Sequence, residues 1–342
     1  MSFQVIIKPS NHLLTVQTDE TILEAALREG YGLSYGCRDG ACGTCKNKVL
    51  DGRVDYGNYQ KSALTDAEKE QGLALFCQAR PLTDLVIECR EVGAIKDIQV
   101  KKLPCRVQKM EKLAPDVMVL YLKLPATEKF RFLAGQYVNI LLKEGRYRSF
   151  SLANAPHDSE FLQLHVRRIP GGDFTEHVFA GMKERDILRI EGPLGTFFMR
   201  EDSDKPIVLV ASGTGFAPVK GMLEHAFASG IARPIVLYWG ARKRADLYMG
   251  ALPEQWQREH VNFRFVPVLS EPLASDGWQG RTGLVHQAVL DDYVDLSGCQ
   301  VYACGTPVMV EAAHRDFTAL RGLPQEEFFS DAFVFSGNPT PP

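Results

Sequence analysis

The stretch Tyr35-Gly36-Cys37-Arg38-Asp39-Gly40-Ala41-Cys42-Gly43-Thr44-Cys45 decides the fold of the N-terminal part of this chain. It spaces three cysteines as C-x4-C-x2-C, and a fourth cysteine, Cys77, follows after a long gap. Four thiolates at this spacing are typical of a [2Fe–2S] site, so the pattern predicts Cys37, Cys42, Cys45 and Cys77 as cluster ligands. The glycines of the stretch allow tight turns and expose backbone N–H groups to the negative charge of a cluster.

Two other interpretations of these cysteines stay open at this point. Zinc sites usually combine two short C-x2–4-C hooks, and the second hook is missing here. Disulfides need an oxidising compartment, of which the sequence gives no sign. The spacing resembles that of plant-type ferredoxins, which implies a β-grasp fold for residues 1–92. Strands at 5–8, 13–16 and 84–89, and a helix capped by Thr21 and Glu24, agree with a small α+β domain.

Length and charge limit the possible function classes. A chain of 342 residues predicts two or three domains, and its net charge of −3 argues against nucleic acid as a partner. No apolar stretch approaches the roughly 20 residues of a membrane span, and the N-terminus lacks a secretory pattern, so we expect a cytoplasmic protein. Residues 1–92 hold 10 Lys and Arg against 13 Asp and Glu, which favours attraction to a basic patch on a partner protein.

Two further domains are expected after a linker at residues 93–102. Short strands at 117–124, 137–142, 161–168 and 186–191 predict an antiparallel barrel over 103–200. Over 201–335, strands at 206–211, 234–239, 263–269 and 300–303 alternate with helices at 218–227, 286–292 and 307–320. This alternation predicts a doubly wound parallel sheet.

The barrel segment contains a candidate dinucleotide site. Arg148 can bind a phosphate through its planar guanidinium, and Ser151 offers a hydroxyl to a flavin ring nitrogen. Gly171 and Gly172 precede a helical stretch, where free N–H groups suit a pyrophosphate. Each of these strings on its own is also common in surface segments and hairpin turns.

The third segment contains a second candidate site at Ser212-Gly213-Thr214-Gly215-Phe216-Ala217-Pro218, between a strand and a helix. Glycine N–H groups and the positive end of a helix suit a pyrophosphate. The common G-x-G-x-x-G fingerprint is absent, and a plain β–α turn is the alternative.

Residues 103–335 resemble the ferredoxin–NADP⁺ reductase superfamily, which carries R-x-[YF]-S, G-x-x-[ST], G-T-G-[IF]-A-P and C-G-x-P-x-M motifs. The resemblance implies FAD in the barrel, with Arg148 at the pyrophosphate and Ser151 near the reactive ring. Phe150 stands where tyrosine is commoner, so a tyrosine hydroxyl contact is lost while the ring is kept. The remaining implied flavin residues are His165, Val166 and Arg167 along the isoalloxazine and Gly172 and Thr175 at a phosphate turn, with the loop at 192–197 closing the domain.

The same resemblance implies a pyridine-nucleotide site. Its residues are Gly213, Thr214, Gly215 and Pro218 at the pyrophosphate, Gly240 and Arg242 beside the adenosine, and Cys304 and Gly305 near the nicotinamide. Asp331 and Phe333 of the tail are expected to cover the flavin, although a terminal strand with core aromatics is an equal alternative. Arg242, Lys243 and Arg244 suit the 2′-phosphate of NADPH, whereas Asp246 suits a 2′-hydroxyl, and NADH is the preferred prediction.

The order of the three segments resembles the single-chain reductases of multicomponent oxygenases. The tail at 328–334 and the cysteine loop are most similar to the reductases that act on CDP-6-deoxy-Δ3,4-glucoseen in 3,6-dideoxysugar synthesis. Hydride from NAD(P)H would then reach FAD, and single electrons would leave through the cluster to a dehydrase or oxygenase component bound near residues 38–44. Ser151, Cys304, Asp331 and Phe333 are the expected catalytic residues. The alternative from another class is an electron carrier whose reductase half is inactive.

Overall fold

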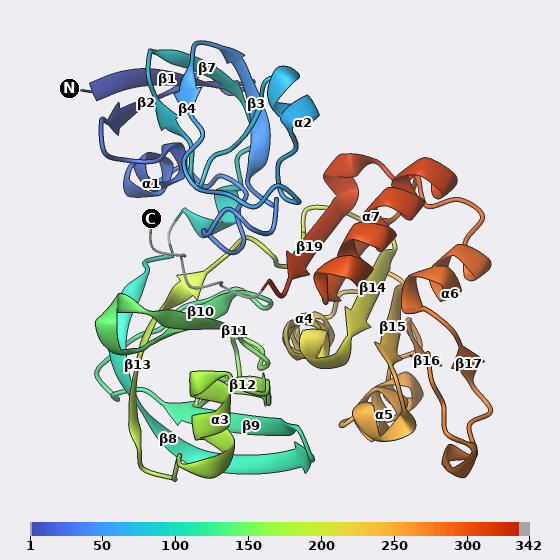
Figure 1. Ribbon diagram of the computed structural model, residues 1–342. Helices are drawn as coiled ribbons and strands as arrows, with labels where there is room; N and C mark the ends of the chain where they lie inside the picture. Colours follow the sequence, from blue (N-terminus) through green and yellow to red (C-terminus); the bar gives the residue numbers. More distant parts are fainter. Residues whose placement is uncertain (1, 97, 335–342) are drawn as a thin grey trace. The chain divides into compact units, whose positions relative to one another are not determined.

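The computed structural model describes residues 2–96 and 98–334 and divides into two compact units (Figure 1). The first unit extends to Gln99 and also includes Gly195–Phe197. The second unit holds Val100–Leu194 and Phe198–Phe333, so the barrel and the parallel sheet cluster together. Residue 97 of the predicted linker and residue 335, the last of the predicted third domain, lie outside the described residues. The three predicted domain ranges remain predictions.

The first unit has the predicted α+β fold. Its five-stranded sheet has the order β2-β1-β7-β3-β5, in which β1 and β7 are parallel and the other neighbouring pairs are antiparallel. Its strands and helices are β1 (Ser2–Lys8), β2 (His12–Gln17), α1 (Ile22–Arg28), β3 (Lys46–Asp51), β4 (Val54–Asp55), α2 (Asp66–Glu70), β5 (Leu73–Leu75), β6 (Arg80–Pro81) and β7 (Leu85–Glu88). The predicted capping box of α1 is confirmed, because Thr21 and Glu24 bond each other's backbone N–H groups. The sequence analysis missed α2, which carries a second capping box at Thr65 and Glu68.

The predicted linker is shorter than expected. Residues Gly93–Ile95 form the 3-10 helix η1, and Ile95 is buried. The N–H of Val92 donates to the carbonyl of Gly32 at 2.7 Å, which fixes the preceding segment to the first unit. At the other end β8 already begins at Lys101. Of the described residues in the predicted linker, 96 and 98–100 lie outside named elements.

The second unit begins with the predicted antiparallel barrel. Its six strands have the order β11-β10-β13-β8-β9-β12, and a bridge between Leu152 and Leu164 joins the two edge strands. Alternate residues of each strand point into an apolar core that includes Val107, Ile140 and Val166. The elements are β8 (Lys101–Ala114), β9 (Val117–Lys123), β10 (Tyr137–Leu141), η2 (Lys143–Gly145), β11 (Tyr147–Ser151), β12 (Leu162–Arg167), α3 (Asp173–Ala180) and β13 (Ile187–Leu194).

The rest of the second unit is a parallel sheet with the order β17-β16-β15-β14-β18-β19 (Figure 1). Helices α6 and α7 pack on one face through a core containing Val289, Val310 and Phe317, and α4 and α5 lie on the other face. The elements are β14 (Ile207–Ser212), η3 (Gly213–Gly215), α4 (Phe216–Ala228), β15 (Ile235–Ala241), η4 (Arg244–Asp246), α5 (Ala251–Glu259), β16 (Phe263–Leu269), η5 (Ala274–Asp276), β17 (Arg281–Thr282), α6 (Val285–Asp292), β18 (Gln300–Gly305), α7 (Pro307–Arg321), η6 (Gln325–Glu327) and β19 (Phe328–Ala332). The predicted doubly wound architecture is confirmed.

Candidate functional site

The four predicted cluster ligands lie in two hydrogen-bonded pairs. The Cys37 thiol donates to Cys42 and lowers the pKa of Cys42 to about 6, while the Cys45 thiol donates to Cys77 and lowers its pKa. Cys45 and Cys77 are buried, and Cys37 and Cys42 are half-buried. A cluster of two irons held by four thiolates takes two thiolates per iron. This pairing therefore fits a [2Fe–2S] cluster.

The backbone of the cysteine loop faces the sulfur atoms. The N–H groups of Asp39, Ala41 and Cys42 donate to Cys37 Sγ at 3.4, 3.5 and 3.4 Å. Gly40 has a φ of +68°, and a Cβ there would lie 2.6 Å from the carbonyl oxygen of Asn58, so the loop requires glycine at this position. The donors partly neutralise thiolate charge.

The two alternative interpretations of the cysteines find no support. All eight cysteines are free thiols. Among the described residues, no group of three or more His, Cys, Asp or Glu side chains could hold a metal ion. Four thiols in two pairs match the donor set of a binuclear iron–sulfur cluster.

The expected catalytic residues of the barrel and the tail meet in the second unit. Ser151, at the end of β11, donates from Oγ to Asp331 Oδ2 at 3.1 Å. Asp331 lies beside Cys304 because β18 and β19 pair in parallel with these two residues in register. Burial, and then the charge of Asp331, raise the pKa of Cys304, so its thiol stays protonated. The tail thus forms the terminal strand of the alternative prediction, and this strand still brings Asp331 to Ser151.

The last expected catalytic residue follows that strand directly. The backbone N–H of Phe333 donates to the carbonyl of Gly305 at 2.8 Å. Gly305 has a φ of +139°, and a Cβ there would lie 2.1 Å from Ser212 Oγ. Gly305 therefore permits the close approach of β14, β18 and the residue after β19.

The β11 residues differ in how they are held. The Arg148 guanidinium donates to the carbonyl of Tyr147 at 2.8 Å and is half-buried. The Phe150 ring lies 5.4 Å from the Phe174 ring of α3 and packs against the barrel core. Ser151 is buried. Arg148 and Ser151 thus offer polar groups from one strand, at the end where a dinucleotide was predicted.

The three residues expected along the isoalloxazine do not share one face of β12. Val166 points into the barrel core, so only its backbone is left for contact with a ligand outside the barrel. His165 and Arg167 point outward. Arg167 Nε lies 3.2 Å from Asp116 Oδ2, and a Cβ on Gly213 would lie 2.8 Å from Arg167 Nη1. Arg167 therefore lies against the glycine turn of the predicted nucleotide site.

His165 forms an unexpected contact with Tyr248, whose hydroxyl lies 2.8 Å from His165 Nδ1. Burial, and then the nearby Lys220 charge, lower the pKa of His165 to about 3, so the imidazole is neutral. Burial raises the pKa of Tyr248, so its hydroxyl keeps its proton. Which of the two groups donates in this bond depends on the tautomer of the ring. His165 Nε2 is buried and has no hydrogen-bond partner among the residues with described positions. Such a buried polar atom fits a site that a ligand completes.

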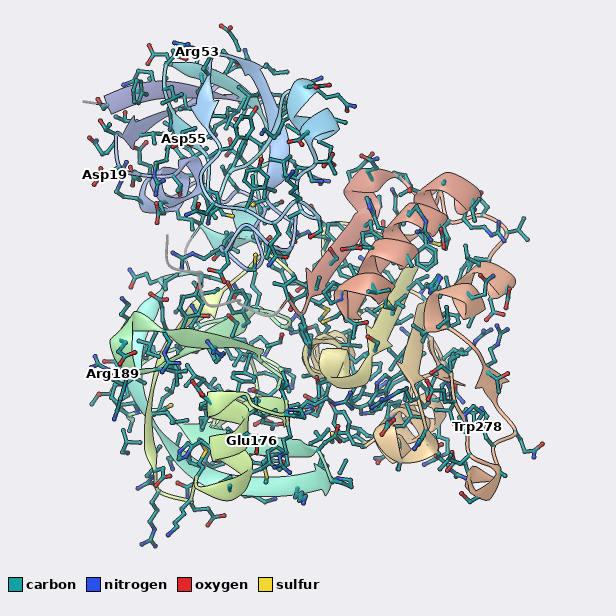
Figure 2. The ribbon with its side chains drawn as sticks, in the orientation of Figure 1. Asp19, Arg53, Asp55, Glu176, Arg189 and Trp278 are labelled. Carbon is teal, nitrogen blue, oxygen red and sulfur yellow. The ribbon has the colours of Figure 1, made fainter. Side chains whose placement is uncertain are left out.

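The predicted phosphate turn of the barrel lies at the start of α3. Gly172 is the N-cap and supplies no side-chain cap, which leaves the first N–H groups of the helix open to an anion. The Thr175 hydroxyl is engaged in the turn itself, accepting from the N–H of Ile169 at 3.1 Å. Glu176, labelled in Figure 2, pairs with Arg168 at 2.8 Å and joins α3 to the end of β12. The fit to a FAD pyrophosphate therefore depends on backbone donors rather than on the Thr175 hydroxyl.

The glycine turn of the nucleotide site joins β14 to α4. A Cβ on Gly215 would lie 2.2 Å from the carbonyl oxygen of Cys304, so only glycine fits at this position. Gly215 caps α4 without a side-chain bond, and Pro218 lies in the first turn, where its missing N–H costs no helical bond. Thr214 is half-buried in the turn. Open N–H groups at a helix start, beside a strand end, fit the pyrophosphate of a pyridine nucleotide.

The two residues expected beside the adenosine have different surroundings. A Cβ on Gly240 would lie 2.7 Å from Val285 Cβ, so this glycine serves the packing of α6 on β15. Arg242 is exposed, and no side-chain hydrogen bond of Arg242 occurs within the described parts of the chain. Asp246 Oδ2 accepts from the N–H of Lys243 at 3.2 Å. That bond competes with the predicted role of Asp246 toward a ribose hydroxyl.

Sequence analysis missed two residues around these sites. Tyr248 contacts His165, and Lys220 is buried in α4. Neither belongs to a recognisable motif, and the only sequence signal was the lysine within the apolar stretch of α4. Trp239 lies in the stretch expected beside the adenosine, and it donates from Nε1 to the carbonyl of Gly213 at 3.0 Å while its ring stacks 4.0 Å from Phe216.

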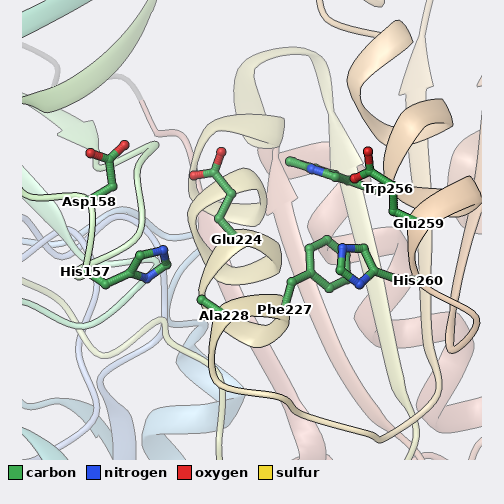
Figure 3. Close-up of a pocket in the computed structure, with 8 residues that line it drawn as sticks. All are labelled: His157, Asp158, Glu224, Phe227, Ala228, Trp256, Glu259 and His260. Atoms are coloured by element: carbon green, nitrogen blue, oxygen red, sulfur yellow. The ribbon is translucent and has the colours of Figure 1, made fainter.

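Figure 3 shows an open pocket of about 450 Å³ on another part of the second unit. Its lining comes from the barrel segment at His157 and Asp158 and from α4, α5 and the residue that follows α5. None of the predicted site residues lines it. Its position therefore gives no support to a role in the predicted chemistry.

The structure combines two thiol pairs, a barrel with open helix N–H groups and a parallel sheet with a glycine turn. Together these features define an electron-transfer oxidoreductase with iron–sulfur, flavin and nucleotide sites. Family models agree with this arrangement. A 2Fe-2S iron-sulfur cluster binding domain matches residues 5–82, an oxidoreductase FAD-binding domain matches 104–199, and an oxidoreductase NAD-binding domain matches 209–315. No helix within the described residues is long and apolar enough to cross a bilayer.

Whole-chain comparisons extend this result. The chain is 40% identical over 334 residues to the CDP-6-deoxy-L-threo-D-glycero-4-hexulose-3-dehydrase reductase of Yersinia pestis, covering 98% of this chain and 99% of the relative. It is 38% identical over 319 residues to DmpP, the phenol 2-monooxygenase reductase component of Pseudomonas sp. (strain CF600), covering 92% and 89%. The solved structure of the Amycolatopsis cytochrome P450 reductase GcoB matches with a TM-score of 0.79 and 35% identity, covering 98% and 100%.

The chain belongs to the family of single-chain reductases that combine 2Fe-2S, FAD-binding and NAD-binding domains. It is an NAD(P)H-dependent oxidoreductase, and electrons from the nucleotide pass through FAD to the [2Fe–2S] cluster. Its relatives are reductase components that serve dehydrases or oxygenases.

Proposed function

We propose that this reductase supplies electrons to a CDP-6-deoxy-L-threo-D-glycero-4-hexulose-3-dehydrase in the cytoplasm. The observation that carries the proposal is the 40% identity to the Yersinia pestis reductase of that name, which spans nearly the whole of both chains. The tail at 328–334, which the sequence analysis associated with this subgroup, contains β19 and Asp331. The similarity therefore includes the strand that reaches Ser151.

Each cofactor would be held by residues that the structure brings together. Cys37, Cys42, Cys45 and Cys77 would bind the cluster. When bound, FAD takes a hydride from the nucleotide and releases electrons singly, as the one-electron cluster requires. Arg148 and the start of α3 would bind the FAD pyrophosphate, and the turn at Gly213–Gly215 would bind that of the nucleotide.

Ser151, Asp331 and Cys304 would shape the site of hydride transfer. The Ser151 proton is directed to Asp331 in the described structure, so the Ser151 oxygen keeps lone pairs that can accept a hydrogen bond from a flavin N–H. The Cys304 thiol is neutral and fully buried, which suits a packing role at the nicotinamide rather than that of a nucleophile. Phe333 would cover the flavin ring.

We place the docking site for the dehydrase near Arg38–Thr44. This loop contains Cys42 and follows Cys37 directly, and these are the two half-buried ligands, so a partner here would lie at a short distance from the cluster, which favours electron transfer. The net charge of −3 over residues 1–92 favours a basic surface on the partner. Added salt should therefore weaken the association.

The test uses the purified, cofactor-loaded chain with NADH and two alternative acceptors. One reaction contains the dehydrase with its CDP-sugar substrate, and the other contains a phenol hydroxylase oxygenase component with phenol. We expect substrate-dependent NADH oxidation only with the dehydrase. Coupling only to the oxygenase would replace the proposal with the second candidate, which the 38% identity to DmpP supports. Failure of NADH and NADPH to reduce the bound flavin would indicate the third candidate, a non-catalytic carrier.

A further inference from the structure

Lys220 is a buried lysine in the middle of α4, and its side chain is only 6% exposed. The neighbouring residues Val219 and Met222 belong to the apolar interior. A buried ammonium group is costly unless all its protons have acceptors. The acceptors around the Lys220 side chain therefore show what holds it in place.

Three acceptors from two parts of the second unit surround Lys220 Nζ. Within α4, Glu224 Oε1 lies at 2.7 Å. From the barrel segment, the carbonyl of Ala153 lies at 3.1 Å and Gln163 Oε1 at 3.3 Å. An ammonium group has three protons, so these acceptors satisfy it completely.

The residue after Lys220 allows α4 to approach the barrel closely. A Cβ on Gly221 would lie 2.9 Å from the carbonyl oxygen of Asn154. Asn154 is fully buried and accepts from the N–H of Gln163 at 2.9 Å, which joins its segment to β12. The barrel backbone at 152–154 therefore lies against α4 with no room for a side chain between them.

The two segments that Lys220 joins lead directly to the two proposed cofactor sites. Ala153 follows Ser151 by two residues, and α4 begins at the turn Gly213–Gly215. We propose that Lys220 is a positioning residue that sets the distance between the flavin side of the barrel and the nucleotide turn. Its bonds to Ala153 and Gln163 fix the barrel segment against α4 so that the nicotinamide meets the flavin at the correct separation.

This inference deepens the proposed function, and its kinetic consequence rests on it. Hydride transfer depends steeply on the separation and alignment of the reacting atoms, and a displacement near 1 Å can cost about 10²-fold in rate. Loss of the Lys220 bonds should therefore lower the limiting rate of flavin reduction while the affinity for NADH, which depends on the glycine turn, is kept.

The experiment compares Lys220→Met and Gln163→Leu with wild type and with Lys183→Met, a matched control at an exposed barrel lysine. Rapid mixing of the full, cofactor-loaded chain with NADH gives the limiting rate of flavin reduction and the Kd. We expect Lys220→Met to lower the limiting rate about tenfold or more with less than about a threefold change in Kd. Gln163→Leu should have a smaller effect in the same direction, and Lys183→Met should equal wild type.

A second readout does not depend on activity. Calorimetry of the full chain should show the barrel and the parallel sheet unfolding in one transition in wild type and in two after Lys220→Met. The proposal would be overturned if Lys220→Met unfolds in the same single transition as wild type and its limiting rate of flavin reduction stays within about twofold of the wild-type rate. If Lys220→Met fails to fold, the same two measurements on Gln163→Leu decide. If neither NADH nor NADPH reduces the wild-type flavin, the proposed function fails, and calorimetry alone still tests the role of Lys220.

Discussion

The Ser151 hydroxyl donates to the Asp331 carboxylate across 3.1 Å, although the two residues lie 180 positions apart in the chain. The bond joins the end of a barrel strand to the terminal strand of the parallel sheet. Because Asp331 is also in register with Cys304 and its charge raises the pKa of that thiol, Asp331 bonds a residue of one proposed cofactor site and lies beside a residue of the other.

We expect Ser151→Ala and Asp331→Ala each to slow flavin reduction by NADH about 10- to 100-fold. A hydrogen bond to a charged group contributes roughly 1.5–3 kcal/mol; Ser151→Ala removes the oxygen that would meet the flavin, and Asp331→Ala removes the group that orients it. Because the residues act as one unit, the double variant should be little slower than the slower single variant. Stopped-flow absorbance at the flavin band measures all three. If the double variant is slowed by the product of the two single-variant factors, the bond does not couple the residues.

Cys77→Ser should remove the cluster and abolish electron delivery to the protein partner while NADH still reduces the flavin. Serine oxygen is a poorer iron ligand than thiolate, and the pair with Cys45 would be broken. Cys89→Ser is the matched control, because Cys89 is equally buried but belongs to neither thiol pair. Iron content and visible absorption measure the outcome, and equal iron loss in both variants would contradict the assignment.

His165→Gln should change the dependence of stability on pH. The folded pKa of His165 is about 3, below the roughly 6.5 of an unfolded histidine, so its contribution is complete above pH 6.5 and is lost as pH falls toward 3. Between pH 6.5 and pH 5, wild type should lose about 2 kcal/mol relative to His165→Gln. Urea unfolding at pH 7.5 and pH 5.0 tests this, and a constant difference between the two proteins would contradict it.

Gly215→Ala should destabilise the parallel-sheet part strongly, because the added Cβ would lie 2.2 Å from the Cys304 carbonyl oxygen. Forcing the backbone apart is expected to cost about 1–3 kcal/mol or more and to weaken nucleotide binding. Gly298→Ala is the control, because nothing lies within 4 Å of its added Cβ. Thermal unfolding with and without NADH measures both effects. Equal melting temperatures for the two variants would mean that the turn can relax.

Arg242→Ala should raise the KM for NADPH at least several-fold and leave that for NADH within about twofold. Arg242 is exposed beside the strand end where the adenosine is expected, and its guanidinium suits the 2′-phosphate that NADPH has and NADH lacks. Steady-state kinetics with both nucleotides measure the effect, with Lys183→Met as the control. If the KM values for NADPH and NADH change by the same factor, Arg242 does not select between the two nucleotides.

The sequence predicted those features that local chemistry determines. Cysteine spacing led to the thiol pairs, alternating strands and helices led to the parallel sheet, and Thr21 with Glu24 indicated the start of α1. Contacts between distant segments gave no comparable signal. The bonds from Lys220 to Ala153 and from Tyr248 to His165 depend on how β12 meets α4 and its neighbours, which no periodicity encodes.

Val166 shows what a motif match leaves open. The motif implied that residues 165–167 lie along the flavin, and strand alternation adds that the Val166 side chain itself points into the barrel core. A motif match specifies the position of a residue in the strand, whereas its face is set by which neighbours are buried.

The position of Asp331 on β19 determines what a truncation of the chain would remove. A truncation after Ser330 would keep all the buried members of the parallel-sheet core, of which Leu323 comes last in the sequence, yet the product would lack the carboxylate that Ser151 contacts. Such a truncated chain should be abundant and pigmented but slow in flavin reduction, so its defect would escape any screen that measures only the amount of folded protein.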